Sequence, residues 1–271
     1  MSDTPASSTW ANPDAYEAFM GRWSLPAAEA VFDRLKLPSG LSWLDVGCGT
    51  GASTQVILSG SDPLDVLGVD PSESFIGAAN NRFNDSRIRF AVGSAESLPA
   101  PDDRFEVVLS ALVLHFVRDA SKSMAEMKRV ARSGGVVISY IWDIENEEQF
   151  TRPFWRAAKD IDPAADAWDR PLRHAISRRD PLLELFERSG LENVAVQEII
   201  FEPRFRDFDD YWQPCTLNGT SPVQRYAHSL PEERQAALAR HLRSILPIAS
   251  DGSITLKGCL LVATGDKPTA P

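Results

Sequence analysis

Three glycines, each separated from the next by one residue, stand where a predicted strand turns into a predicted helix. Gly47, Gly49 and Gly51 follow the largely apolar run 41–46, and the helical pattern 50–58 overlaps them. Glycine tolerates the positive φ of tight turns, and its missing Cβ lets a ligand lie against the backbone. The start of a helix adds unpaired N–H groups and a partial positive charge. This loop is therefore the first candidate binding site.

Two acidic residues stand at the ends of predicted strands beside this loop. Asp45 precedes the glycines, and Asp70 closes the apolar run 66–69. A carboxylate before the glycines is a poor neighbour for a pyrophosphate but a good one for an ammonium group. Asp70 lies about 20 residues beyond the loop, where a mononucleotide-binding βαβ unit carries its ribose-binding acid. A glycine loop that a ligand can approach closely, an acid for an amino group and an acid for ribose hydroxyls together predict S-adenosylmethionine (SAM).

The motifs of this region resemble those of the class I SAM-dependent methyltransferases, most closely the small-molecule group called type 11. The resemblance covers roughly residues 40–143, in order, with DVGCGTG (45–51), GVDPS (68–72), GSAESLP (93–99), DRFEVV (103–108) and EMKRVARSGG (126–135). Several motifs at family spacing are more specific than one glycine loop. The resemblance implies an α/β fold, a Rossmann-like seven-stranded, mostly parallel sheet with helices on both faces and a helical cap insertion.

The same resemblance implies which residues surround the cofactor. The glycine loop passes the methionine part of SAM, Asp45 helps to hold its amino group, and Asp70 takes the ribose hydroxyls. Ser94 stands where the family commonly has an Asp that accepts from the adenine amino group, so a water or the Ser94 hydroxyl has to substitute. The predicted cofactor-binding residues are Asp45, Gly47, Cys48, Gly49, Thr50, Gly51, Asp70, Pro71, Ser72, Ser94, Ala95, Glu96, Ser110, Ala111 and Leu112.

Methyl transfer from a sulfonium is an in-line displacement, so catalysis depends on alignment and on the exclusion of water. Such a reaction needs no metal, and none of the histidines has a metal-type partner at close spacing. His115, which follows the fourth predicted strand, is the candidate general base, because an imidazole titrates near working pH. Ordinary packing is the alternative interpretation of His115.

Aromatic residues that precede the first predicted strand, and others at and after the end of the fifth, are candidates for an acceptor pocket. Aromatic walls suit an apolar or flat acceptor and also attract cations. Packing of a cap against the sheet is the alternative interpretation. Arg22 is a candidate partner for an anionic acceptor or for the SAM carboxylate. The predicted substrate-binding residues are Tyr16, Arg22, Trp23, Tyr140, Trp142, Phe150, Phe154 and Trp212.

Three predicted parts make up the chain. Residues 1–40 are expected to form an N-terminal helical lid, and residues 41–143 a SAM-binding α/β core in which strands alternate with helices. Residues 144–271 complete the sheet with strands near 194–201 and 254–263 and insert a helical substrate cap. The carboxyl ends of parallel strands meet at one edge of such a sheet, where ligands bind.

Local signals predict several helix boundaries. The aromatic stripe of residues 16–23 and the amphipathic segment 26–35 predict two separate helices before the first strand. In the second half, Asp180 is the predicted N-cap of a helix with Pro181 at its first position. Gly190 is predicted to close that helix.

Composition limits the class of protein. The formal net charge of the 271 residues is −10, and an acidic surface repels phosphate backbones, so no nucleic acid partner is expected. The polar start lacks an apolar signal region, and no run of about 18 apolar residues predicts a membrane span. The scattered cysteines Cys48, Cys215 and Cys259 indicate reduced thiols and a cytoplasmic protein. Monomer and homodimer both stay open.

Two other functions fit part of these patterns. Gly47, Gly49 and Ala52 also satisfy G-x-G-x-x-G/A, so an NAD(P)-binding Rossmann oxidoreductase is one alternative. Asp45, the 93–99 stretch and the lack of a clear second mononucleotide half argue against it. A non-catalytic SAM-binding sensor or scaffold is the other alternative. The prediction is a SAM-dependent methyltransferase (EC 2.1.1.-) that moves a methyl group by in-line displacement to a small-molecule acceptor.

Overall fold

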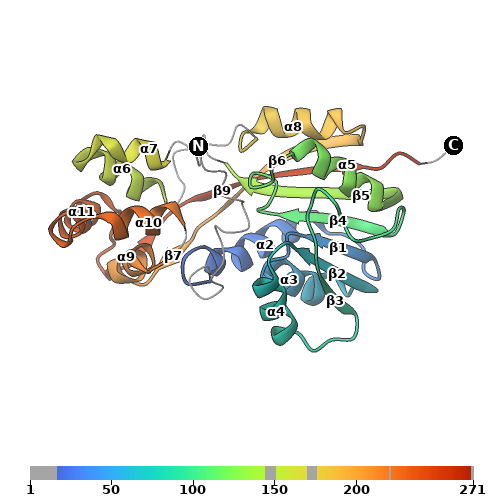
Figure 1. Cartoon of the computed structure of the whole chain (residues 1–271), viewed down its shortest axis with the longest axis horizontal. Coiled ribbons are helices and arrows are strands. Elements are labelled where there is room, and N and C mark those ends of the chain that lie inside the picture. The colour runs from blue at the N-terminus through green and yellow to red at the C-terminus, as the bar shows by residue number, and fades with distance from the viewer. Residues whose placement is uncertain (1–16, 144–150, 170–175, 220, 270–271) are drawn as a thin grey trace.

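The computed structural model describes residues 17–143, 151–169, 176–219 and 221–269 (Figure 1). Its main sheet contains β1 (Ser42–Val46), β2 (Asp65–Asp70), β3 (Ile88–Val92), β4 (Phe105–Ala111), β5 (Ala131–Trp142), β6 (Glu192–Phe201) and β9 (Gly258–Asp266). The strand order of this seven-stranded sheet is β3-β2-β1-β4-β5-β9-β6. β9 runs antiparallel to both of its neighbours, whereas the other pairings are parallel. The predicted mostly parallel sheet is confirmed.

Helices cover both faces of this sheet. On one face lie α2 (Arg22–Leu35) and α3 (Ala52–Ser61), and on the other α5 (Ala120–Val130) and α8 (Arg179–Arg188), while α4 (Glu73–Arg82) packs against β2 and β3. Side chains of β1 alternate between the two layers, with Trp43 toward α2 and α3, and with Leu44 and Val46 toward α5 and α8. Every residue of β1 is buried, as expected for a parallel strand covered on both faces.

The second half of the chain adds a group of helices beside one end of the sheet, on the left of Figure 1. These elements are α6 (Arg152–Ile161), η3 (Pro163–Ala165), α7 (Asp166–Asp169), α9 (Phe208–Thr216), α10 (Pro222–Ser229), α11 (Glu232–Ile245) and the strand pair β7 (Arg204–Phe205) with β8 (Ile254–Thr255). Aromatic rings join them, and Tyr226 packs on Trp155 and Trp168 with centroids 5.6 and 5.9 Å apart. Within the described residues, no helix combines the length and apolar character needed to cross a bilayer.

The N-terminal segment is continuous where two helices were predicted. A π-helix, η2 (Glu17–Gly21), runs directly into α2, and Pro26 lies inside α2 without ending it. Proline removes one helix hydrogen bond. Burial of Ala27, Ala28 and Val31, each with no exposed surface, supports the helix beyond that point.

Two boundaries in the second half also differ from prediction. The run 254–263 is not one strand, because β8 pairs with β7 and the chain enters β9 only at Gly258. The apolar positions of this run, which is interrupted at Thr255, Lys257 and Gly258, do not reveal such a change of partner. α8 begins at Arg179 with Arg178 at the N-cap position, so Asp180 is not the cap. Pro181 fits in the first turn of α8 because the N–H groups of that turn have no partner within the helix.

Substitution of Trp43 tests the packing between β1 and α2. Its side chain is fully buried and stacks on Phe32 with centroids 5.6 Å apart. Trp43→Ala is expected to lower the free energy of unfolding by about 3–5 kcal/mol, measured by urea denaturation. Trp43→Phe is the matched control. The indole Nε1 has no hydrogen-bond partner among the described residues, so Trp43→Phe should cost less than about 1.5 kcal/mol. Equal costs would contradict this account.

Candidate functional site

Hydrogen bonds tie the turn after β1 to the end of β2. Gly47 N and Cys48 N donate to Val69 O at 2.7 and 3.1 Å. Gly49 N donates to Asp70 Oδ2 at 3.0 Å. The glycine loop and the second predicted acid therefore lie side by side at the carboxyl edge of the sheet.

The three glycines of the loop are required for two different reasons. Gly47, Gly49 and Gly51 have φ of +73°, +56° and +93°, which disfavours residues with a side chain. A Cβ at Gly47 would overlap the Val113 side chain, and one at Gly51 would overlap Phe83. A Cβ at Gly49 would meet only Phe75, at 3.9 Å, among the described atoms. Space for a ligand is therefore left at Gly49, where its close approach stays a prediction, whereas the protein itself fills the space at the other two.

Asp70 is positioned by backbone donors from two turns. Its Oδ1 accepts from Ser72 N at 2.8 Å and its Oδ2 from Gly49 N at 3.0 Å. Burial raises the pKa of this carboxyl, although the two N–H groups oppose the shift. Each carboxylate oxygen can accept two hydrogen bonds, so among the described residues one acceptor position on each oxygen stays available. A pair of neighbouring hydroxyl groups fits that arrangement.

A cleft of about 280 Å³ opens beside Asp70. It brings together seven predicted cofactor residues, namely Gly47, Asp70, Pro71, Ser72, Ser94, Ala95 and Glu96. Sequence reasoning missed the other lining residues, which are Phe75, Val113, Phe116, Val117 and Arg118. A local signal existed for Phe75, which stands three residues after the N-cap Ser72 and donates its N–H to that hydroxyl. The others follow the predicted Leu112 directly in the chain.

The wall of the cleft formed by residues 94–96 is fixed to α5. Ser94 Oγ accepts from Glu96 N at 3.1 Å, and Glu96 Oε1 accepts from Asp119 N, at the start of α5, at 2.9 Å. Further along, Leu98 N donates to Glu126 Oε2 at 2.8 Å. The Ser94 hydroxyl therefore accepts a hydrogen bond from Glu96 N and can still donate its own proton. Glu96 adds a carboxylate to the same wall of the cleft.

Asp45 lies beneath the first turn of α3 and not among the residues that line the cleft. Its Oδ2 accepts from Ser53 Oγ and Thr54 Oγ1, both at 2.7 Å, and its Oδ1 has no hydrogen-bond partner among the described residues. Complete burial raises the pKa of this carboxyl from 3.8 to about 6, against the lowering effect of the two hydroxyls. Repulsion from Asp70 adds to the rise. Its predicted contact with a cofactor amino group stays a prediction.

The remaining predicted cofactor residues lie behind the cleft surface. Cys48 is buried, and burial raises the pKa of its thiol well above the usual value, so the thiol stays protonated. Thr50 Oγ1 donates to a carboxylate oxygen of Glu17, on η2. Ser110 is fully buried, and Ala111 is partly buried beside it. Leu112 adopts φ +61° and donates its N–H to Tyr140 O at 2.8 Å.

His115 is buried and packs on the ring of Phe116, with centroids 4.0 Å apart. It is absent from the lining of the cleft, whereas its neighbour Phe116 belongs to it. This geometry favours packing, and the general-base role stays a prediction. Within the described ranges, no three His, Cys, Asp or Glu side chains gather as metal ligands would.

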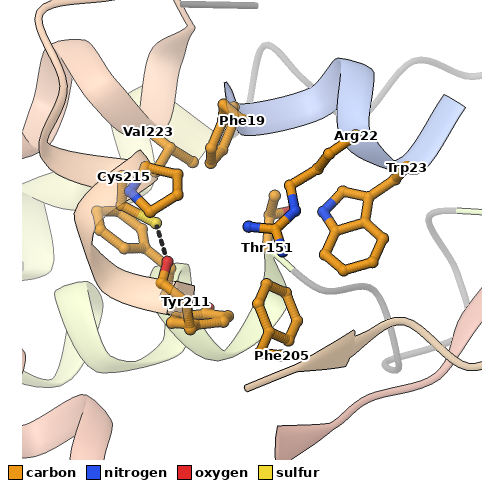
Figure 2. Close-up of a pocket in the computed structure, with 10 residues that line it drawn as sticks. Phe19, Arg22, Trp23, Thr151, Phe205, Tyr211, Cys215 and Val223 are labelled. Atoms are coloured by element: carbon orange, nitrogen blue, oxygen red, sulfur yellow. Dashed lines mark hydrogen bonds between the residues drawn. The ribbon is translucent and has the colours of Figure 1, made fainter. Parts of the chain in front are cut away.

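A second, nearly filled pocket of about 10 Å³ lies between η2, the start of α2, and the inserted helices (Figure 2). It brings together three of the predicted substrate residues, Arg22, Trp23 and Phe154. The other residues that line it come from distant parts of the chain; they are Phe19, Thr151, Phe205, Tyr211, Pro214, Cys215 and Val223.

The other predicted substrate residues lie elsewhere. Tyr140 is buried within the sheet, and Trp142 packs on Phe201 with centroids 5.5 Å apart. Trp212 stacks on Phe154 from behind the pocket lining, with centroids 6.3 Å apart. The remaining two, Tyr16 and Phe150, fall outside the described residues.

The burial of Asp45 predicts a pH dependence of stability. An acid whose pKa is raised on folding contributes stability that is complete below its unfolded pKa, and that contribution is lost as pH rises through about 6. The free energy of unfolding of the wild type, relative to Asp45→Asn, should therefore fall by about 3 kcal/mol between about pH 4 and pH 7. Urea denaturation of both proteins across this range measures the difference. A constant difference would show that Asp45 does not titrate there.

Comparisons with known proteins agree with the geometry of the cleft. Residues 44–139 match the family model described as a methyltransferase domain. The chain is 32% identical over 162 residues to ajmaline N-methyltransferase of Rauvolfia serpentina, which is 57% of this chain and 55% of that protein. It is 27% identical over 248 residues to trans-aconitate 2-methyltransferase of Variovorax paradoxus, covering 89% and 92% of the two chains.

A solved structure shows the same fold. Phosphoethanolamine N-methyltransferase 2 of Haemonchus contortus, in complex with SAM, has a TM-score of 0.60 at 16% identity and covers 95% of this chain and 57% of that one. The chain also spans only about half the length of the ajmaline enzyme, 55%, so what these proteins share is a domain. Residues 44–139 therefore match a methyltransferase domain, in keeping with the resemblance of the sequence motifs to the class I SAM-dependent methyltransferases.

Proposed function

We propose that this chain transfers a methyl group from SAM to a small-molecule acceptor. One observation carries the proposal. The Asp70 carboxylate bridges the glycine loop and the turn after β2, and it still offers free acceptor positions to a cleft of about 280 Å³. A ribose with two adjacent hydroxyls fits this carboxylate.

The residues around the cleft suit the other parts of the cofactor. Pro71 and Phe75 supply apolar surface for a flat base, and the carboxylate of Glu96 supplies an acceptor for an exocyclic amino group. Gly49 leaves its backbone open for the amino-acid end. Asp45 lies buried close by, where its negative charge favours an ammonium group. When bound, SAM supplies a methyl group on a positively charged sulfur. The methyl group passes to a nucleophile that attacks in line, and the sulfur leaves as the thioether of SAH.

The protein's own contribution is to bind, to orient and to exclude water. The cleft wall of residues 94–96 is held by the first turn of α5, and the glycine loop is held by Asp70. Rigid positioning of this kind can supply much of the rate acceleration of a displacement reaction. No step requires a residue of this chain to become covalently modified.

The relatives support a small organic acceptor. Two of them are named as methyltransferases of ajmaline and of trans-aconitate, and the second match spans 89% of this chain. The net charge of −10 speaks against a nucleic acid substrate. Free thiols at all three cysteines are in keeping with a cytoplasmic protein. Monomer and homodimer both remain compatible with this function.

Calorimetric titration with S-adenosylhomocysteine (SAH) and with NADH tests the proposal against a nicotinamide enzyme. We expect SAH to bind and NADH to produce no heat of binding, because β9, next to β5 in the sheet, runs antiparallel and does not continue a second parallel half. A panel assay for SAH release then separates an enzyme from a SAM-binding sensor. Binding of NADH without SAH would overturn the proposal, and SAH binding without turnover of any acceptor would favour the sensor.

Asp70→Ala tests the ribose assignment. Loss of hydrogen bonds to a charged acceptor should weaken SAH binding by about 1–3 kcal/mol. Asp65→Asn is the matched control, because Asp65 stands at the other end of the same strand and pairs with Arg104 and Arg89. Calorimetry should give Asp65→Asn the affinity of the wild type. Unchanged binding by Asp70→Ala, or equal losses in both variants, would remove Asp70 from the site.

A further inference from the structure

The pocket in Figure 2 combines aromatic walls with one positive charge. Among its ten lining residues, Arg22 is the one with a charged side chain. The guanidinium extends into the space between Trp23, Phe205 and Thr151 (Figure 2). It lies 4.7 Å from the centroid of the Trp23 ring and 5.4 Å from that of Phe205. The planar cation thus packs on aromatic rings on one side, while its side chain remains 29% exposed.

One edge of this guanidinium is already used. Arg22 Nη2 donates to Asp210 Oδ2 at 3.1 Å, and Nη1 donates to Asp210 Oδ1 and to its backbone O, each at 3.3 Å. A guanidinium carries five N–H donors. Among the described residues, nothing accepts from the Nε–H. The side-on edge, Nε with the second Nη2 hydrogen, is therefore available, and two parallel N–H groups match both oxygens of a carboxylate.

Asp210 orients Arg22. It also accepts from Arg206, through the backbone N at 3.0 Å and Nη2 at 3.4 Å. Partial burial alone would raise the pKa of Asp210, but the hydrogen bonds from Arg22 and Arg206 hold it below its usual value. Asp207 and Asp209 line the open hollow beside this cluster, so the attraction for a carboxylate comes from the free edge of the guanidinium and not from an excess of positive charge.

The pocket is also connected to the glycine loop. Glu17, which accepts from Thr50 in that loop, precedes Arg22 by five residues on the continuous segment formed by η2 and α2. Glu17 and Arg22 lie about one turn apart on this segment, because a π-helix bonds residue i to residue i+5. The segment that carries Arg22 therefore also contacts the glycine loop.

We propose that Arg22 binds a carboxylate of the methyl acceptor through its side-on edge, so that the acceptor is a small organic acid with an apolar or flat body. This inference rests on the proposed function. The free volume of about 10 Å³ admits roughly one water molecule, so the aromatic side chains must separate to admit the acceptor. Its apolar part then lies among the rings of Phe19, Phe154 and Tyr211.

Binding of acids and of their neutral counterparts tests this inference. The probes are benzoate, phenylacetate and hexanoate, each beside its carboxamide, titrated calorimetrically into the full chain saturated with SAH. We expect at least one acid to bind about tenfold or more tighter than its amide, because the amide cannot form the charged, two-point contact. Equal binding of acids and amides, or no binding of any acid, would overturn the inference.

Two variants separate recognition from structural support. Arg22→Gln removes the guanidinium and should abolish the preference for acids. Asp210→Asn breaks the same ion pair but keeps Arg22 and removes a negative charge beside the ligand, so it should keep or increase the preference. Equal loss in both variants would mean that the ion pair only holds the pocket in shape, and the inference would fail. Urea denaturation establishes that both variants are folded.

Failure of the Arg22 inference can be distinguished from failure of the proposed methyl transfer. A protein that binds SAH and methylates only neutral acceptors contradicts the role of Arg22 and leaves methyl transfer intact. A protein that binds no SAH contradicts methyl transfer. In that case, the preference for acids over amides, measured without cofactor, still decides whether Arg22 recognises a carboxylate.

Discussion

The rest of the site depends on one carboxylate that joins two turns far apart in the sequence. β1 and β2 pair in parallel, with Val46 opposite Val69, so the turns that follow them meet at one edge of the sheet. Asp70 accepts a backbone N–H from each turn, from Gly49 and from Ser72. The positive φ of the glycines lets the loop bend so that its N–H groups face this edge. The shape of the cleft follows from these contacts, because the loop and the start of α4 share one anchor.

The electrostatics of this edge are unfavourable for the protein alone. Asp45 and Asp70 are both buried, and burial raises the pKa of each carboxyl. Uncompensated polar groups in the interior cost stability. Asp45 keeps one oxygen without a hydrogen-bond partner among the described residues. Such local conflicts are typical of functional sites, and two partly desolvated acids favour a ligand that carries positive charge.

Local sequence features predicted more of the residues that line the cleft beside Asp70 than of those that line the pocket in Figure 2. Buried parallel strands are continuous apolar runs that end in polar residues, so the positions of Asp70 and Ser94 at the sheet edge were readable. The neighbours of Gly47 and Gly51 were not, because Val113 and Phe83 reach them through tertiary packing. The pocket in Figure 2 is harder still to predict, since its residues come from several elements and Arg22 contacts Asp210, which is 188 positions away. No periodicity encodes contacts of that kind.

The segment formed by η2 and α2 contacts both the glycine loop and the inserted helices, and its two ends are held differently. Ala27 and Val31 of α2 are fully buried against the sheet, so this end is part of the core. The other end touches the glycine loop through Glu17 and the inserted helices through the Arg22–Asp210 pair. π-Helical turns such as η2 are often found at functional sites. Moving α9 away from Arg22 breaks the Arg22–Asp210 pair and leaves Ala27 and Val31 in the core, whereas lifting α2 exposes both, so we expect the pocket to open on the side of the inserted helices.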